Sequence, residues 1–396
     1  MKLAKRMNRL GTETAFEVLA KAQKLEAQGK NVIHLEIGEP DFNTPENIIS
    51  AGQNALSNGF TSYNPSPGYG DLRDVIANEI NTSRGINVSG ENVIVTPGGK
   101  PIMFFVMLAL IESGDEVLYP NPGFPIYESM IEFCGGTAVP MKLHGDRDFN
   151  IDIEEVRSQI TSKTKLMIIN SPNNPCGSIL GDSELEQLAN IAKENNILVL
   201  SDEIYSRFLF EGEHNSITTF PDMLSRTIIL DGFSKTYAMT GWRIGYAAGD
   251  KEIIKAIAKI QSQSTTNPSS ISQAAAVEAL NGKQDFIQIR SKAFQERRDF
   301  VVNSLNAIEG IECIKPDGAF YVFPSCKGMM GKKDKNGNKI NNDFDFVQSL
   351  LENNGVAVVQ GSAFGLEGFF RISYATSMDK LKDAMGRIKN FCESLS

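Results

Sequence analysis

A short stretch of the sequence, SKTYAMTGWR at residues 234–243, places one lysine and one arginine among small, hydroxylated and aromatic residues. A lysine with few charged neighbours has a lowered pKa, so part of its amine is unprotonated and can attack a carbonyl carbon. Arg243 and the hydroxyl of Ser234 suit a phosphate dianion. Lys235 is therefore a candidate for holding a phosphorylated carbonyl compound covalently. The alternative is a lysine at a strand end with its amine in solvent.

Three further stretches carry polar residues at the ends of apolar runs. VLSDEIY (199–205) brings Asp202 and Tyr205, and a carboxylate in that position is costly unless it meets a cation or caps a helix. IINSPNNPCG (168–177) pairs Asn173 with Asn174 between prolines, and TPGGKPIMFF (96–105) places two glycines before a helix. Taken alone, that glycine pair is better explained by an ordinary turn into a helix, although free N–H groups at the start of a helix also form an anion site.

Taken together, these residues match the needs of a phosphorylated pyridine aldehyde. The lysine forms a Schiff base, the aspartate keeps the ring nitrogen protonated, and Tyr and Asn hydrogen-bond the ring hydroxyl. Glycine amides, Ser and Arg hold the phosphate. One such motif is weak evidence, whereas four in this order favour a covalent cofactor site.

The surrounding pattern predicts elements that can position these residues. From about residue 46 to 282, short apolar runs alternate with amphipathic stretches, which is typical of a mostly parallel sheet flanked by helices. In one of these stretches, 182–196, Ser183 is predicted to cap the helix. Ligand sites in such sheets lie beyond the carboxyl ends of the strands. The predicted strands are 92–96, 116–120, 165–170, 197–202, 227–232 and 243–249.

After about residue 283 the pattern changes to a long charged helix, the short strands 318–323 and 356–361, and a final helix. This indicates a second, smaller α+β domain. The amphipathic segment at about 13–29 is expected to pack on that domain or on another subunit. Residues 326–343 are polar and glycine-bearing and are interpreted as a mobile surface loop.

Nearly the whole chain resembles the class I aminotransferases of pyridoxal-phosphate fold type I. Besides the stretches above, the resemblance rests on IGEPDFNTP (37–45), SYNPSPGYGDLRDVIA (62–77), NPGFPIY (121–127), SQSTTNPSSISQ (262–273) and FRISYA (370–375). It implies an α/β fold with a mostly parallel seven-stranded sheet in a large domain (46–282) and a small α+β domain (283–396). The N-terminal segment (1–45) would contribute to the small domain.

The resemblance also implies roles for individual residues. Lys235, Asp202 and Tyr205 would be the catalytic residues, with Lys235 forming the aldimine and moving the substrate Cα proton. The pyridoxal 5'-phosphate would be held by Gly99, Lys100, Phe124, Asn174, Asp202, Tyr205, Ser234, Lys235, Arg243 and, from the neighbouring subunit, Tyr63. The substrate would be held by Gly38, Lys100, Asn174 and Arg371, with Arg371 clamping the α-carboxylate. A homodimer with shared active sites follows from the role of Tyr63.

The substrate side remains open at this stage. Transfer from an L-amino acid to a 2-oxo acid, with 2-oxoglutarate as the expected acceptor, needs a second cation for a dicarboxylate substrate. A related bacterial subgroup uses the lysine of its GGK turn for this purpose, and Lys100 stands at that position, which favours aspartate or a similar acidic amino acid. If Lys100 only lies near the phosphate or points to solvent, then alanine, kynurenine or aromatic substrates are open. A pyridoxal-phosphate-dependent lyase on the same fold also remains an alternative.

Composition excludes several other classes of protein. A net charge of −9 argues against nucleic acid as a partner, and the longest apolar run, 102–111, is too short to span a membrane. The five cysteines have no metal-ligand spacing, so no metal is expected; reduced thiols indicate the cytoplasm. A nicotinamide-dependent dehydrogenase is disfavoured because no strand leads into G-x-G-x-x-G. A ligand-sensing module would need a DNA-binding extension, for which the matching stretches leave no room.

Overall fold

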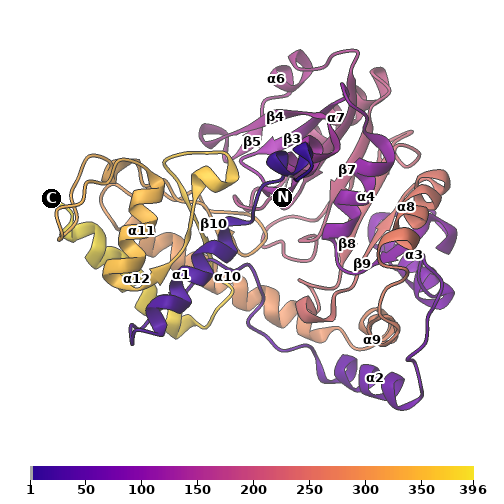
Figure 1. The fold of residues 1–396 in the computed structure, drawn as a ribbon, viewed down its shortest axis with the longest axis horizontal. Coiled ribbons are helices and arrows are strands. Elements are labelled where there is room, and N and C mark those ends of the chain that lie inside the picture. Colours follow the sequence, from indigo (N-terminus) through magenta and orange to yellow (C-terminus); the bar gives the residue numbers. More distant parts are fainter. Residues whose placement is uncertain (1–2) are drawn as a thin grey trace.

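The computed structural model describes residues 3–396. Figure 1 shows a helix-flanked sheet on one side and, beside it, a smaller group of elements that includes α10, α11 and α12. The main sheet has eight strands in the order β2-β9-β8-β7-β6-β3-β4-β5. Their bounds are β2 Val93–Thr96, β3 Glu116–Asn121, β4 Thr137–His144, β5 Asn150–Ile151, β6 Thr164–Asn170, β7 Leu198–Asp202, β8 Thr227–Gly232 and β9 Gly245–Ala248.

Most strands of this sheet run in one direction, as predicted. The neighbours from β8 through β7, β6 and β3 to β4 are parallel, whereas β9 is antiparallel to both β8 and β2. The α/β fold type I architecture is confirmed. The sheet exceeds the predicted seven strands because the two-residue β5 pairs with the end of β4 at the edge.

The central strands are apolar on consecutive residues because helices cover both faces of the sheet. Leu166 and Ile168 of β6 pack in one cluster with Ile102 of helix α4. Met167 and Ile169 point to the opposite face and pack with Leu188 of helix α7. The helices are α1 Thr14–Glu26, α2 Glu46–Ser57, α3 Gly70–Arg84, α4 Lys100–Leu110, α5 Ile126–Cys134, α6 Ile153–Ser158, α7 Asp182–Glu194, α8 Lys251–Ser264, α9 Ser270–Asn281, α10 Asp285–Asn306, α11 Asp343–Asn354 and α12 Met378–Ser394.

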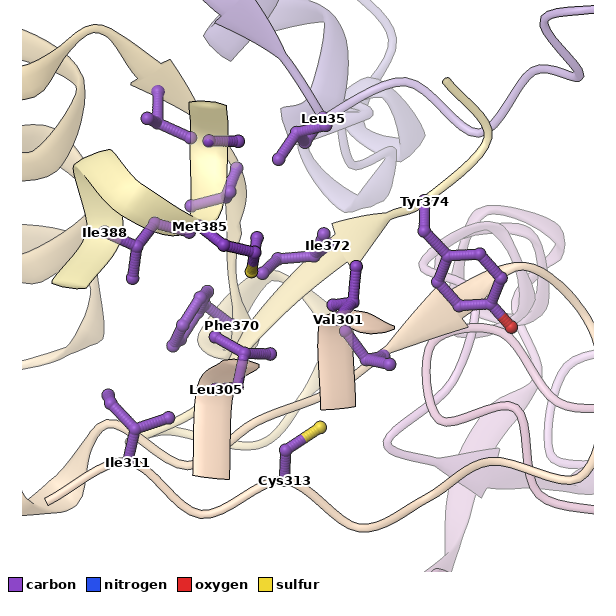
Figure 2. Packing of buried hydrophobic residues seen from close by; sticks show 14 of the residues in the cluster. Leu35, Val301, Leu305, Ile311, Cys313, Phe370, Ile372, Tyr374, Met385 and Ile388 are labelled. Carbon is purple, nitrogen blue, oxygen red and sulfur yellow. The ribbon is translucent and has the colours of Figure 1, made fainter. Parts of the chain in front are cut away.

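The C-terminal part of the chain supplies most residues of one hydrophobic core. A small sheet of order β10-β13-β12 (Tyr321–Val322, Phe370–Ser373 and Val359–Gln360) packs with α10, α11 and α12. Figure 2 shows Val301 and Leu305 of α10 near Phe370 and Ile372, and Leu35 from the N-terminal segment beside them.

The N-terminal helix packs against this same part of the protein. Val18 and Ala22 of α1 contact Leu351 and Ala357. Strand β1 (Ile33–His34) pairs with β11 (Val356–Ala357). We propose on this basis that the chain divides near residues 45 and 282, with residues 1–45 contributing to the smaller unit.

Two local expectations turn out differently. Helix α7 begins at Asp182 with Gly181 as its N-cap residue, so Ser183 lies inside the first turn and does not cap the helix. Within segment 326–343, the buried carboxylate of Asp334 accepts hydrogen bonds from the backbone N–H groups of Asn336 and Asn338 and from the Ser349 hydroxyl. The loop therefore has internal order that its composition did not indicate. Among residues 3–396, no helix combines the length and the apolarity needed to cross a bilayer.

Candidate active site

A cavity of about 590 Å³ lies where the strand ends meet the C-terminal part of the chain. Strands β6 and β7 end at Asn170 and Asp202, and β8 ends three residues before Lys235. All of the predicted site residues except Tyr63 line this cavity: Gly38, Gly99, Lys100, Phe124, Asn174, Asp202, Tyr205, Ser234, Lys235, Arg243 and Arg371. The structure thus brings together residues separated by up to 333 positions.

The amine of Lys235 is partly buried and points into the cavity rather than into bulk solvent. Its Nζ donates a hydrogen bond to the carbonyl oxygen of Gly38 and lies 5.9 Å from the ring centroid of Tyr205. Burial, followed by the positive charge of Arg371, lowers the pKa of Lys235 to about 8. A larger fraction of the amine is therefore unprotonated near neutral pH than in an ordinary lysine.

Asp202 is a buried carboxylate without a positive partner. The residue is 3% exposed and accepts hydrogen bonds from the Tyr127 hydroxyl at 2.7 Å and from the Ile204 backbone N–H at 3.3 Å. Among the described residues, no Lys, Arg or His nitrogen lies within 4.0 Å of its oxygens. Burial raises the pKa of Asp202 to about 7. The site therefore lacks a positive charge that a ligand could supply.

A buried ion network fixes the strand ends behind these two residues. Arg84 of α3 donates to Glu203 and to Asp231, each at 2.7 Å, and so links the end of β7 to β8. The pKa of Glu203 lies below its usual range despite its burial, because Arg84 and His214 stabilise the carboxylate. This network holds the backbone that carries Asp202 and Lys235 in place.

Arg371 lies on β13, lines the cavity and is 4% exposed. Its Nη1 donates to Asn174 Oδ1 at 3.0 Å and its Nη2 donates to the Glu36 carbonyl at 2.6 Å. The guanidinium carbon lies 4.7 Å from the ring centroid of Tyr321 and 4.8 Å from that of Phe364. Its Nε is buried without a partner in the described chain. Of five N–H donors, three remain for a ligand, which is enough for a bidentate carboxylate contact.

The start of α4 offers unpaired backbone donors. The N–H groups of Gly99 and Lys100 donate no hydrogen bond within the part of the chain described, as expected for the first turn of a helix. Gly98 has φ +92°, and a Cβ added there would overlap the guanidinium of Arg243. Glycine is therefore required at this position, and the Arg243 guanidinium lies beside the helix N-terminus. An anion at this point would meet backbone donors and a positive charge together.

Sequence reasoning missed three side chains that belong to this geometry. Tyr127 donates to Asp202, Asn170 accepts from the Asn174 N–H at 2.9 Å, and Tyr321 shares a 2.7 Å hydrogen bond with Tyr205. Tyr127 could have been found because it closes the quoted stretch NPGFPIY, three residues after Phe124. Tyr321 lies in an apolar strand run that looks like ordinary core.

Tyr63 is the one predicted site residue that lies elsewhere. It is 89% exposed and is not among the residues that line the cavity. Within residues 3–396 of one chain, Tyr63 therefore takes no part in the cavity.

Comparison with known proteins identifies the class. Residues 30–388 match the family described as aminotransferase class I and II, and the chain belongs to this family. It is therefore an aminotransferase, an enzyme class that depends on pyridoxal phosphate and moves an amino group to a 2-oxo acid.

Individual relatives match over almost their full length. A protein named probable aspartate/prephenate aminotransferase from Rhizobium leguminosarum bv. phaseoli is 45% identical, covering 98% of each chain. The crystal structure of the aspartate aminotransferase from Rhizobium meliloti is 41% identical with a TM-score of 0.96, covering 100% of both chains. Aspartate aminotransferase from Thermus thermophilus, solved with maleate, is 38% identical with a TM-score of 0.93, covering 99% of this chain and 100% of that one.

Proposed function

We propose that the cavity holds pyridoxal 5'-phosphate and that Lys235 is the amine that binds its aldehyde. The observation that carries this proposal is Asp202, a buried carboxylate without a cation, in the same cavity as a partly buried lysine of lowered pKa. A protonated pyridine nitrogen supplies the positive charge that this carboxylate lacks. The N–H groups of Gly99 and Lys100, with Ser234 and Arg243, would hold the phosphate, so the residues present fit the group.

The remaining ring contacts follow from neighbouring side chains. Tyr205 and Asn174 would hydrogen-bond the ring oxygen, and Phe124 would lie against the ring face. Tyr127 keeps Asp202 oriented, and its phenol stays protonated because burial raises its pKa well above the usual value. Asp202 therefore accepts a proton-bearing nitrogen in a fixed position.

When bound, the cofactor supplies an aldehyde for the amino group and an electron-withdrawing ring that eases removal of a proton from the substrate Cα. Lys235 Nζ would be the base that takes this Cα proton, and the bound cofactor would supply the carbon to which Lys235 delivers it. Its lowered pKa suits that role, because a base works best when its pKa lies near the operating pH. Arg371 binds the α-carboxylate, with Asn174 and the backbone of Gly38 beside it, and so sets which Cα bond faces Lys235.

We further propose that the donor is aspartate or a similar acidic amino acid and that the acceptor is 2-oxoglutarate. Two things support an acidic preference. Lys100 contributes a second cation to the cavity, which would bind the side-chain carboxylate while Arg371 binds the α-carboxylate. The relatives named above also carry aspartate in their names. The first of them is also named for prephenate, a 2-oxo acid that likewise carries a second carboxylate.

A homodimer with shared sites and a cytoplasmic location complete the proposal. The exposed position of Tyr63 leaves its hydroxyl free to reach the phosphate in a neighbouring subunit. Five free cysteines, four of them buried, suit a reducing compartment.

The visible absorption spectrum of the cofactor-loaded protein tests this function. A yellow band that aspartate or glutamate removes, and that 2-oxoglutarate restores, is the expected result. Prephenate is included as a second acceptor. Loss of the band only with alanine or aromatic amino acids would leave transamination in place and refute the acidic preference. Ammonia release without any need for a 2-oxo acid would instead identify a lyase.

A further inference from the structure

The cavity contains an ion pair that the proposed reaction does not use. The Nζ of Lys100, at the start of α4, contacts a carboxylate oxygen of Glu13, the residue just before α1. Both residues line the cavity, and both also line a smaller adjoining cavity of about 210 Å³. The cation suited to a substrate carboxylate thus already has a carboxylate partner within the chain.

The surroundings of Lys100 explain why it needs such a partner. Its Nζ lies 5.5 Å from the ring centroid of Phe124 and 5.9 Å from that of Phe16, and its side chain is 44% exposed. An ammonium between two rings has lost part of its hydration, and ring faces replace only some of it. Without Glu13, this end of the cavity would carry an unpaired positive charge.

Glu13 is placed so that it can leave without disturbing the fold. Its side chain is 30% exposed, makes no capping hydrogen bond to α1, and has Lys100 as its only side-chain partner in the described chain. The segment around it is held independently, because the Gly11 N–H donates to Ser129 Oγ at 2.8 Å. The carboxylate can therefore turn into solvent while the segment stays in place.

We propose that Glu13 is a specificity-determining residue that competes with the side-chain carboxylate of an acidic substrate for Lys100. With an uncharged side chain in the cavity, Glu13 stays on Lys100 and keeps that end of the site neutral. With an acidic side chain, the substrate carboxylate displaces Glu13 into solvent. The same cavity then serves acidic and uncharged substrates, at the cost of weaker binding of the acidic ones. This inference rests on the proposed function, in which Lys100 reads the distal carboxylate.

The test measures binding of unreactive ligands to the cofactor-loaded enzyme by calorimetry. Maleate represents a dicarboxylate, and 3-phenylpropionate represents a monocarboxylate with an uncharged side chain. Glu13→Gln is compared with the wild type and with a control, Glu17→Gln, which lies in the first turn of α1 outside the cavity. A second pair of variants, Lys100→Met with and without Glu13→Gln, shows whether any effect depends on Lys100.

Glu13→Gln should bind maleate roughly two- to fivefold more tightly, the range for an ion pair with partly exposed partners. Binding of 3-phenylpropionate should be unchanged or weaker, and Glu17→Gln should match the wild type. In the Lys100→Met background the gain for maleate should vanish. Unchanged or weaker maleate binding by Glu13→Gln would overturn the role of Glu13 while leaving the proposed function intact. An equal gain for both ligands would also overturn it. If the wild type binds 3-phenylpropionate but not maleate, the acidic preference itself fails and the competition falls with it.

Discussion

Replacement of Arg371 is the mutation whose effect the structure defines most fully. The guanidinium is buried, stacked between two rings, and uses two of its five N–H donors on Asn174 Oδ1 and the Glu36 carbonyl. The remaining three N–H donors are left for a carboxylate that enters the cavity. In Arg371→Leu, an amino-acid carboxylate that enters the cavity meets no positive charge at this position.

The expected loss is large because a buried charge is left without its partner. Breaking such a pair costs about 3–5 kcal/mol, which corresponds to between about a hundredfold and a few thousandfold in affinity. Arg371→Lys keeps the charge but loses the planar fork, so its loss should be smaller. The protein itself should also lose roughly 1–3 kcal/mol in the Leu variant, because the two acceptors lose their donor.

Rapid mixing of the cofactor-loaded enzyme with amino acid separates binding from chemistry. The rate of loss of the visible band, plotted against amino-acid concentration, gives an apparent dissociation constant and a limiting rate. The apparent dissociation constant for the amino acid should rise between about a hundredfold and a few thousandfold. The affinity for pyridoxal phosphate in the absence of substrate should change little. An unchanged dissociation constant, or an equal loss of cofactor affinity, would refute the role of Arg371 as the carboxylate clamp.

Two further predictions concern the cofactor side and the subunit contact. Burial raises the pKa of Asp202 to about 7 from its ordinary 3.8. The protonated carboxyl therefore adds up to about 4 kcal/mol to the free energy of unfolding of the cofactor-free protein. This contribution is complete below about pH 4 and is lost as the pH rises through 7. Cofactor-free Asp202→Asn should therefore match the wild type in denaturant unfolding near pH 4 and exceed its stability at pH 8; a constant difference would contradict this reasoning. If Tyr63 completes the neighbouring site, Tyr63→Ala should bind pyridoxal phosphate roughly tenfold or more weakly. Hybrid dimers of one Tyr63→Ala subunit and one Lys235→Ala subunit should then regain one intact site. An activity no higher than the mean of the two parent variants would argue against shared sites.

The sequence predicted the side chains at strand ends because their positions follow from local pattern and sheet topology alone. Asp202 ends an apolar strand and Lys235 follows another, and parallel strands bring such ends to one edge. The resemblance to the aminotransferases then added Arg371 and Gly38, which come from elements with no pattern of their own.

Other features depend on tertiary contacts that local pattern does not contain. Strand β4 was missed because Pro140 and partly exposed residues interrupt its apolar pattern at the sheet edge. The contact of Glu13 with Lys100 joins positions 87 residues apart and has no signal in either segment. Ser183 is not the cap because helix α7 starts at Asp182, two residues earlier than a helix capped by Ser183 would start.

Trapping the cofactor on its lysine tests the role of Lys235 most directly. The purified protein is loaded with pyridoxal phosphate, reduced with borohydride and digested, and the modified peptide is located by mass spectrometry. One phosphopyridoxyl group per chain is expected on Lys235, and none on Lys235→Ala. Modification at Lys100, or no specific modification at all, would contradict the assignment of Lys235 as the cofactor-binding amine.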